Sequence, residues 1–72
     1  MQATNERSTE LRELRKQRRL TLEAVSVLAR VDPATISRIE RHEIAPRPET
    51  IVALAGALRI SARRLARMVK QP

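Results

Sequence analysis

The chain has 72 residues and carries 15 Lys and Arg against 8 Asp and Glu, a formal net charge of +7 at pH 7. A chain of this length forms one small domain. Its positive charge indicates a polyanionic partner, and nucleic acid is the leading candidate. The absence of Cys, Phe, Trp and Tyr excludes disulfides and thiolate metal sites. It also removes the aromatic rings that grip single strands, so duplex recognition is favoured.

The composition also argues against catalysis and against a membrane partner. One His, no Cys and one Gly leave no cluster of metal ligands and no phosphate-cradling loop, so we expect neither an enzyme nor a bound cofactor. No run reaches the roughly 18 apolar residues of a membrane span, and the beginning of the chain lacks the apolar centre of a signal peptide. We therefore expect a cytoplasmic, nucleoid-associated protein.

Helical periodicity and helix-start signals predict one all-α domain. Residues 1–7 are polar and aperiodic, which predicts a flexible N-terminal tail before a domain over residues 8–70. Ser8 or Thr9 is placed to cap a first helix that runs to about Arg18. Together with four later helix starts, this pattern predicts a compact bundle of five short helices.

The second helix is predicted to follow its N-cap, Thr21, and to span residues 22–29. A rotation of 100° per residue gives its inward positions as Val25, Leu28 and Ala29. Leu22 and Val27 fall outside that stripe and are expected to be exposed, which hints at a partner surface.

Asp32 and Pro33 mark the start of a third helix over residues 33–41. The carboxylate can accept the free N–H groups of the first turn, and proline needs no hydrogen bond at the first helical position. The side that points into the domain is defined by Ile36 and Ile39, with Glu40 at its flank.

The outward face of this third helix carries Ala34, Ser37, Arg38 and Arg41. A guanidinium group can bond guanine, a hydroxyl can bond either base type, and a methyl can rest on thymine. Such a face suits the major groove of duplex DNA. An ordinary solvated helix face is the alternative.

Two further helices complete the bundle. Pro48 begins a fourth helix that runs to about Leu58, and Gly56 within it predicts close packing or an interface. Ile44 is expected to pack the preceding connector against the core. Ser61 caps the fifth helix, whose shared apolar face is predicted to hold Ala62, Leu65, Ala66 and Val69.

Residues 11–69 resemble the Cro/repressor-type (XRE-like) helix-turn-helix family. The matching segments are LRELRKQRRLT (11–21), Val31, TISRIER (35–41), Pro46 and ETIVALAGAL (49–58). The resemblance implies a lambda-repressor-like five-helix fold in which the second and third helices form the helix-turn-helix. It also implies binding to operator DNA as a homodimer.

The resemblance further implies roles for individual residues. The base edges would be read by Ala34, Ser37 and Arg38. The DNA backbone would be contacted by Thr21, Thr35, Arg41, His42 and Arg47, with a thymine methyl as the alternative partner of Thr35. Arg15 and Glu40 match a family pair that joins the first helix to the third, which predicts a structural ion pair between them.

Four positions depart from the family pattern. Arg19, Arg30 and His42 stand where the family often has Gly in a left-handed conformation, which other residues adopt reluctantly. Leu22 replaces a Gln that braces the third helix and meets a phosphate in relatives. The Gln contact is therefore not expected in this chain.

Three functions are compatible with these patterns. The leading hypothesis is a sequence-specific, double-stranded DNA-binding transcriptional regulator, a repressor that inserts helix 33–41 into the major groove. The alternative is an antitoxin or adaptor that binds another protein through Leu22, Val27 or Met68 and can also bind its own operator. A third interpretation takes the apolar side of the fifth helix as a surface for anionic lipid, although it lacks aromatic anchors.

Overall fold

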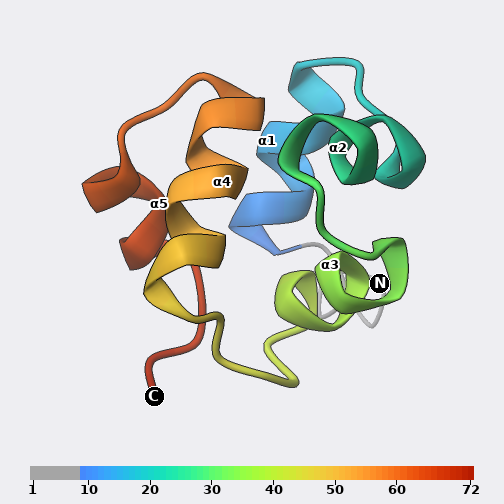
Figure 1. Ribbon diagram of the computed structural model, residues 1–72. Helices are drawn as coiled ribbons and strands as arrows, with labels where there is room; N and C mark the ends of the chain where they lie inside the picture. The colour runs from blue at the N-terminus through green and yellow to red at the C-terminus, as the bar shows by residue number, and fades with distance from the viewer. Residues whose placement is uncertain (1–8) are drawn as a thin grey trace, which may run out of the picture.

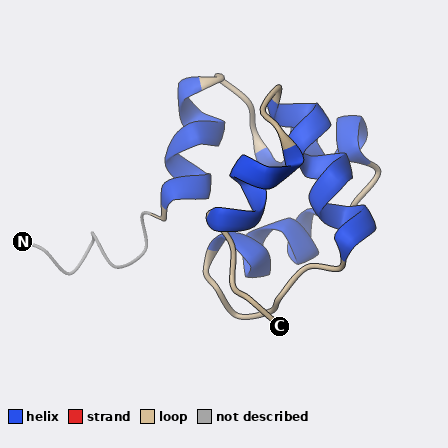
Figure 2. Ribbon diagram, turned by 90° about the vertical axis from the view of Figure 1, so that its left-hand side faces the viewer, coloured by secondary structure: helices blue, strands red, loops and turns tan. Residues whose placement is uncertain are grey.

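The computed structural model describes residues 9–72, and the tail predicted over residues 1–7 and the Ser8 cap lie outside that range. Within it the chain forms helices and loops without strands (Figure 2). The helices are α1 (Glu10–Gln17), α2 (Leu22–Ala29), α3 (Pro33–Glu40), α4 (Pro48–Leu58) and α5 (Ala62–Arg67). The predicted all-α, five-helix fold is confirmed.

The helix starts follow from the capping residues. The side chains of Thr9, Thr21, Asp32 and Ser61 each accept hydrogen bonds from N–H groups of the first turn that follows. α4 has no side-chain cap and begins instead with Pro48, whose ring presets the helical φ and which has no N–H to satisfy. These local signals explain why the starts were predictable.

The first four helices end in the same way, and each is followed by a residue with a left-handed backbone, an arginine in three cases and a histidine in one. Positive φ angles of 58–60° occur at Arg19, Arg30, His42 and Arg59. In each case the next N–H donates back to a carbonyl five residues earlier, as Leu20 does to Arg15 at 3.1 Å and Ile60 to Ala55 at 3.0 Å. The left-handed conformation predicted at the first three positions is confirmed, and Arg59 is a fourth that the sequence analysis missed.

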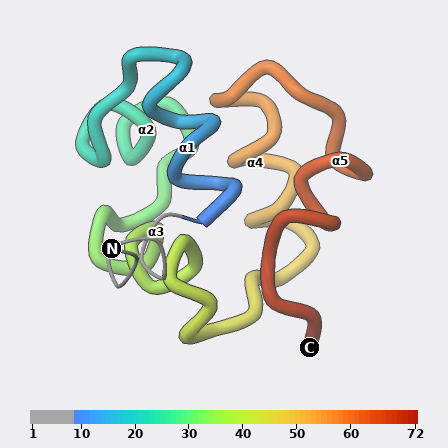
Figure 3. The backbone as a smooth tube through the Cα atoms, turned by 180° about the vertical axis from the view of Figure 1, so that it is seen from behind, coloured from blue at the N-terminus to red at the C-terminus, as the bar shows by residue number. Residues whose placement is uncertain are grey.

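The core is assembled from all five helices. Its buried apolar residues are Leu11, Leu14, Val25, Ala29, Ile36, Ile39, Leu54, Ala55, Leu58, Leu65, Met68 and Val69. α4 packs against both α2 and α5, and α3 lies across the lower half of the molecule in Figure 1 and in the reverse view of Figure 3. The core therefore backs α3 and leaves its opposite side uncovered.

Three expectations about apolar residues were wrong. Leu28 is 58% exposed, because the helix it faces, α4, ends at Leu58 and leaves that side of α2 open. Met68 is buried at 5% exposure, because it lies three residues after the buried Leu65 and therefore on nearly the same side of the helix. Ile44 is 37% exposed, and Pro46 is the buried residue of the connector.

The expected exposure of two α2 residues had mixed outcomes. Val27 is 77% exposed, as predicted. Leu22 is only partly exposed and packs against the core. The proposed partner surface of Leu22, Val27 and Met68 therefore does not form as one exposed patch.

Gly56 is exposed on α4 and makes no close packing contact, contrary to expectation. A Cβ atom at this position would meet no heavy atom within 4 Å, and Gly56 does not have a positive φ.

Gly56→Ala is therefore expected to raise the free energy of unfolding by up to about 1 kcal/mol, because alanine loses less backbone entropy in a helix. Urea denaturation followed by circular dichroism measures the change. A loss of stability that grows with protein concentration would contradict it and indicate a second copy packed against Gly56.

Candidate nucleic-acid interface

α3 is held against the domain by its inner face and by its start. Ile36 and Ile39 are each 1% exposed in the core. The carboxylate of Asp32 accepts from the N–H groups of Ala34 at 3.0 Å and Thr35 at 3.3 Å. The helix axis is thus fixed by packing on one side and by a charged cap at its N-terminus.

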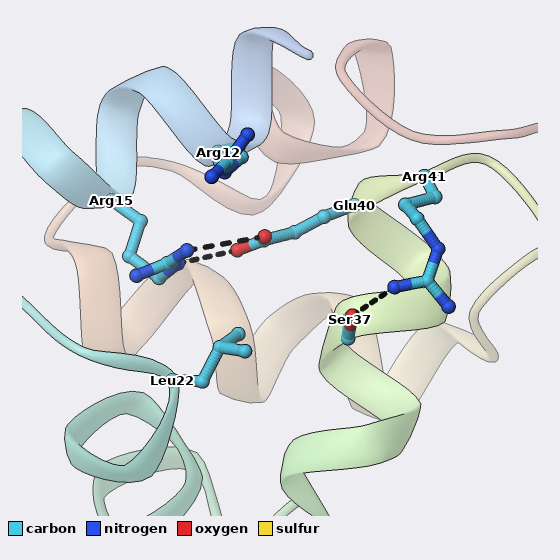
Figure 4. A pocket seen from close by; sticks show the side chains of 6 residues that line it. All are labelled: Arg12, Arg15, Leu22, Ser37, Glu40 and Arg41. Carbon is cyan, nitrogen blue, oxygen red and sulfur yellow. Dashed lines mark hydrogen bonds and ion pairs between the residues drawn. The ribbon is translucent and has the colours of Figure 1, made fainter. Parts of the chain in front are cut away.

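The expected ion pair between Arg15 and Glu40 is present and buried. Arg15 Nε donates to Glu40 Oε2 at 2.6 Å, Arg15 Nη2 donates to Glu40 Oε1 at 3.4 Å, and the two residues are 9% and 4% exposed (Figure 4). Arg15 Nη1 also donates to the carbonyl of Leu20 at 2.8 Å. One guanidinium group therefore ties α1, the α1–α2 turn and α3 together.

A groove of about 270 Å³ runs between α1 and α3 beside this pair. Figure 4 shows Leu22 on the α2 side of the ion pair, and Ser37 and Arg41 on the outward side of α3. The groove is lined by Arg12, Arg15, Leu22, Ser37, Glu40 and Arg41. Leu22 contributes only apolar surface here, so it cannot donate the hydrogen bond that a Gln would offer.

The predicted base-reading residues lie together on α3. Ala34 and Arg38 are exposed, and Ser37 is half-buried beside the groove. All three project from the side of α3 opposite Ile36 and Ile39. The arrangement presents a methyl group, a hydroxyl and a guanidinium group on one rigid surface.

The residues predicted to contact a DNA backbone lie around that surface. Arg41, His42 and Arg47 are exposed, and the half-buried Thr35 lines a second groove together with Arg47. Thr21 is exposed at the start of α2, where its hydroxyl oxygen accepts from the Ala24 N–H at 3.0 Å. The Thr21 hydroxyl can still donate its own hydrogen to another group.

A hydrogen-bonded chain on the outward face was not anticipated. Arg41 Nη1 donates to Ser37 Oγ, and Arg41 Nε donates to Glu43 Oε2 at 2.8 Å. Arg41 Nη2 also donates to Glu43 Oε1 at 3.3 Å. The signal for it was the spacing of Ser37 and Arg41 at i and i+4, together with an acidic residue, Glu43, two positions after Arg41. A helical wheel of α3 alone does not include Glu43.

The Arg41–Glu43 contact changes how both groups titrate. The hydrogen bond from Arg41 lowers the pKa of the Glu43 carboxyl below its ordinary value, and the same bond raises the pKa of Arg41. Because the pKa of Glu43 is lower in the folded than in the unfolded state, the contact stabilises the fold above the ordinary pKa of Glu. That contribution is lost as the pH falls through the lowered value.

Glu43 is expected to titrate with a midpoint at lower pH than an ordinary Glu side chain. An NMR titration of the side-chain carboxyl carbons should place Glu43 below the ordinary Glu range in the wild-type protein. In the Arg41→Ala variant the midpoint should rise, because the donor of the bidentate contact is gone. An unchanged midpoint in that variant would mean that the contact does not persist in solution.

Neither a metal site nor a membrane span is found in the described part of the chain. Residues 9–72 contain no group of three or more His, Cys, Asp or Glu side chains arranged to hold a metal ion. In the same range no helix is both long and apolar enough to cross a membrane.

Comparison with known proteins establishes the family. The helix-turn-helix family model matches residues 11–65, which include every residue of the α3 surface and of the Arg15–Glu40 pair. The chain belongs to the helix-turn-helix family. Within it, α2 and α3 are the two helices of the motif, and the resemblance inferred from the sequence is confirmed.

The chain is similar to the uncharacterized HTH-type transcriptional regulator RghRB of Bacillus subtilis (strain 168). It is 42% identical over 52 residues, which are 71% of this chain and 37% of the relative. The chain therefore spans little more than a third of that protein's length. No solved structure matches the chain.

Proposed function

We propose that the protein is a sequence-specific regulator of transcription that binds double-stranded DNA, acts without catalysis and inserts α3 into the major groove. The observation that carries the proposal is the fixed pose of α3. The buried Arg15–Glu40 pair joins α3 to α1, and the opposite side of α3 presents Ala34, Ser37 and Arg38. Membership of a helix-turn-helix family and the net charge of +7 support the same function.

In the proposed complex the residues divide into two groups. Arg38 forms a bidentate contact with guanine, Ser37 bonds a base edge, and Ala34 contacts a thymine methyl. The surrounding donors position the protein on the sugar-phosphate backbone and carry no sequence information themselves. These backbone contacts are assigned to Thr21, Thr35, Arg41, His42 and Arg47.

The proposed regulator acts as a homodimer and represses by occupying its operator. One recognition helix reads only a few base pairs, and two related by a two-fold axis and spaced by about 34 Å, one DNA turn, read enough for specificity. α5 and the connector before α4 are the proposed dimer surface. With duplex DNA as its partner, the protein is proposed to reside in the cytoplasm on the nucleoid.

Selection from random duplexes at near-physiological salt tests this function. We expect enrichment of a palindromic consensus, which would report specificity and two-fold symmetry together. Affinity for that site should fall with salt at a log–log slope of about 0.9 per phosphate neutralised. Failure to enrich any sequence, with binding that ignores salt, would refute DNA regulation.

The burial of several side chains argues against the two other functions considered from the sequence. An antitoxin or adaptor acting through Leu22, Val27 or Met68 would rely on a surface in which Met68 is buried and Leu22 half-buried. The lipid-binding interpretation of α5 is wrong about its apolar face, because Leu65, Met68 and Val69 are all in the core. A protein partner has a better-defined candidate surface elsewhere.

A further inference from the structure

A groove of about 330 Å³ lies at the end of the molecule where α1 and α4 terminate. Its lining is Arg18, Leu20, Leu28, Ala57 and Arg59. In Figures 1 and 3 the connection from α4 to α5, which contains Arg59, is at the top, whereas α3 lies in the lower half. The groove is thus away from the proposed DNA-reading surface.

The floor of this groove is apolar and incompletely covered. Leu28 is 58% exposed, and Leu20 and Ala57 are half-buried. α4 ends at Leu58, so no further helical turn covers Leu28. A leucine-sized side chain from a partner would remove this apolar surface from water.

The rim of the groove is cationic, and its donors are available. Arg18 Nε donates to the carbonyl of Leu58 at 2.9 Å, which fixes the guanidinium group at the groove. Among residues 9–72, the Nη groups of Arg18 and the whole guanidinium of Arg59 have no hydrogen-bond or ion-pair partner. None of the five lining residues is acidic.

We propose that this groove docks an acidic protein segment, an amphipathic helical turn that places a leucine-sized side chain between carboxylates. The apolar side chain would pack on Leu20, Leu28 and Ala57, and the carboxylates would accept from Arg18 and Arg59. A phosphate backbone would satisfy the arginines but leave the apolar floor exposed, so the lining favours a peptide over nucleic acid. None of the five lining residues belongs to α3, so a docked segment would leave the base-reading face of α3 open to DNA.

The test uses the full chain labelled with ¹⁵N and a short synthetic helical peptide built from Leu, Glu and Ala. Amide shifts should concentrate at Arg18, Leu20, Leu28, Ala57 and Arg59. A control peptide with Leu replaced by Ser, and one with Glu replaced by Lys, should each bind at least about tenfold more weakly. Equal binding of the Ser peptide, or shifts centred on α3, would overturn the proposal.

Two variants with matched controls separate docking from general electrostatics. Leu28→Ser and Arg59→Gln should each weaken the peptide about fivefold or more, since one removes the apolar contact and the other a carboxylate donor. Val52→Ser changes an apolar residue of similar exposure to Leu28, and Arg67→Gln changes another exposed cation. Both lie outside the groove and should leave peptide affinity unchanged. Thermal unfolding of each variant verifies that it folds.

Two further outcomes would replace the proposed occupant. Displacement of the peptide by duplex DNA through the same amides would assign the groove to nucleic acid. Concentration-dependent self-association that Leu28→Ser abolishes would assign it to a second copy. Variants of α3 are expected to lose duplex binding and to keep peptide binding. Failure of the DNA-binding proposal can therefore be distinguished from failure of the docking proposal.

Discussion

Glu40→Ala is expected to lower the free energy of unfolding by about 3–5 kcal/mol, the usual cost of leaving one member of a buried ion pair without its partner. A domain of 72 residues has about 4–11 kcal/mol of stability in total. The substitution should therefore remove a large share of the protein's stability. Urea denaturation followed by circular dichroism measures the shift in midpoint.

Two controls distinguish the buried pair from ordinary surface charge. Glu43→Ala also removes a carboxylate bonded to an arginine, but both side chains are about half exposed, so the midpoint should change little. The double variant Arg15→Met/Glu40→Leu fills the same space without charge and should recover most of the loss or exceed the wild type by roughly 1–4 kcal/mol. Equal losses in Glu40→Ala and Glu43→Ala would contradict a special role for the buried pair.

Arg38→Ala is expected to weaken binding to the selected operator by about 1–3 kcal/mol and to relax a guanine preference at one position of each half-site. The reason is the loss of a bidentate contact that distinguishes guanine from the other bases in the major groove. Fluorescence anisotropy with labelled duplexes measures the affinity for the consensus and for single-base variants.

The matched control is Arg47→Ala, which also removes one exposed arginine but lies on the connector before α4. This variant should weaken all sequences by a similar factor and reduce the salt slope by about 0.9, as expected for one lost phosphate contact. If Arg38→Ala weakens every duplex equally, Arg38 contacts the backbone and the base-reading assignment is wrong.

Local signals predicted the fold well because they act within one helical turn. Thr21 and Pro48 gave the starts of α2 and α4, and the observed ranges Leu22–Ala29 and Pro48–Leu58 match the predictions. The Arg15–Glu40 pair was predictable from two flank positions and a family resemblance. Such features need no knowledge of how far one helix extends past another.

The wrong assignments depend on that missing information. Leu28 points towards the core on a wheel, but whether it is covered depends on where α4 stops. The Arg41–Glu43 contact required knowing that the chain turns at His42, where φ is 60°.

The thermal stability of this domain can be raised at the turns that end its helices, where arginine and histidine adopt the left-handed conformation. A residue other than glycine in that conformation costs about 1 kcal/mol or more, and residues 9–72 contain four of them. Favourable interaction of a cation with the helix C-terminus offsets part of that cost. Replacing Arg19 and Arg30 by glycine would therefore raise the melting temperature without altering the core, and the protein would lose two positive charges.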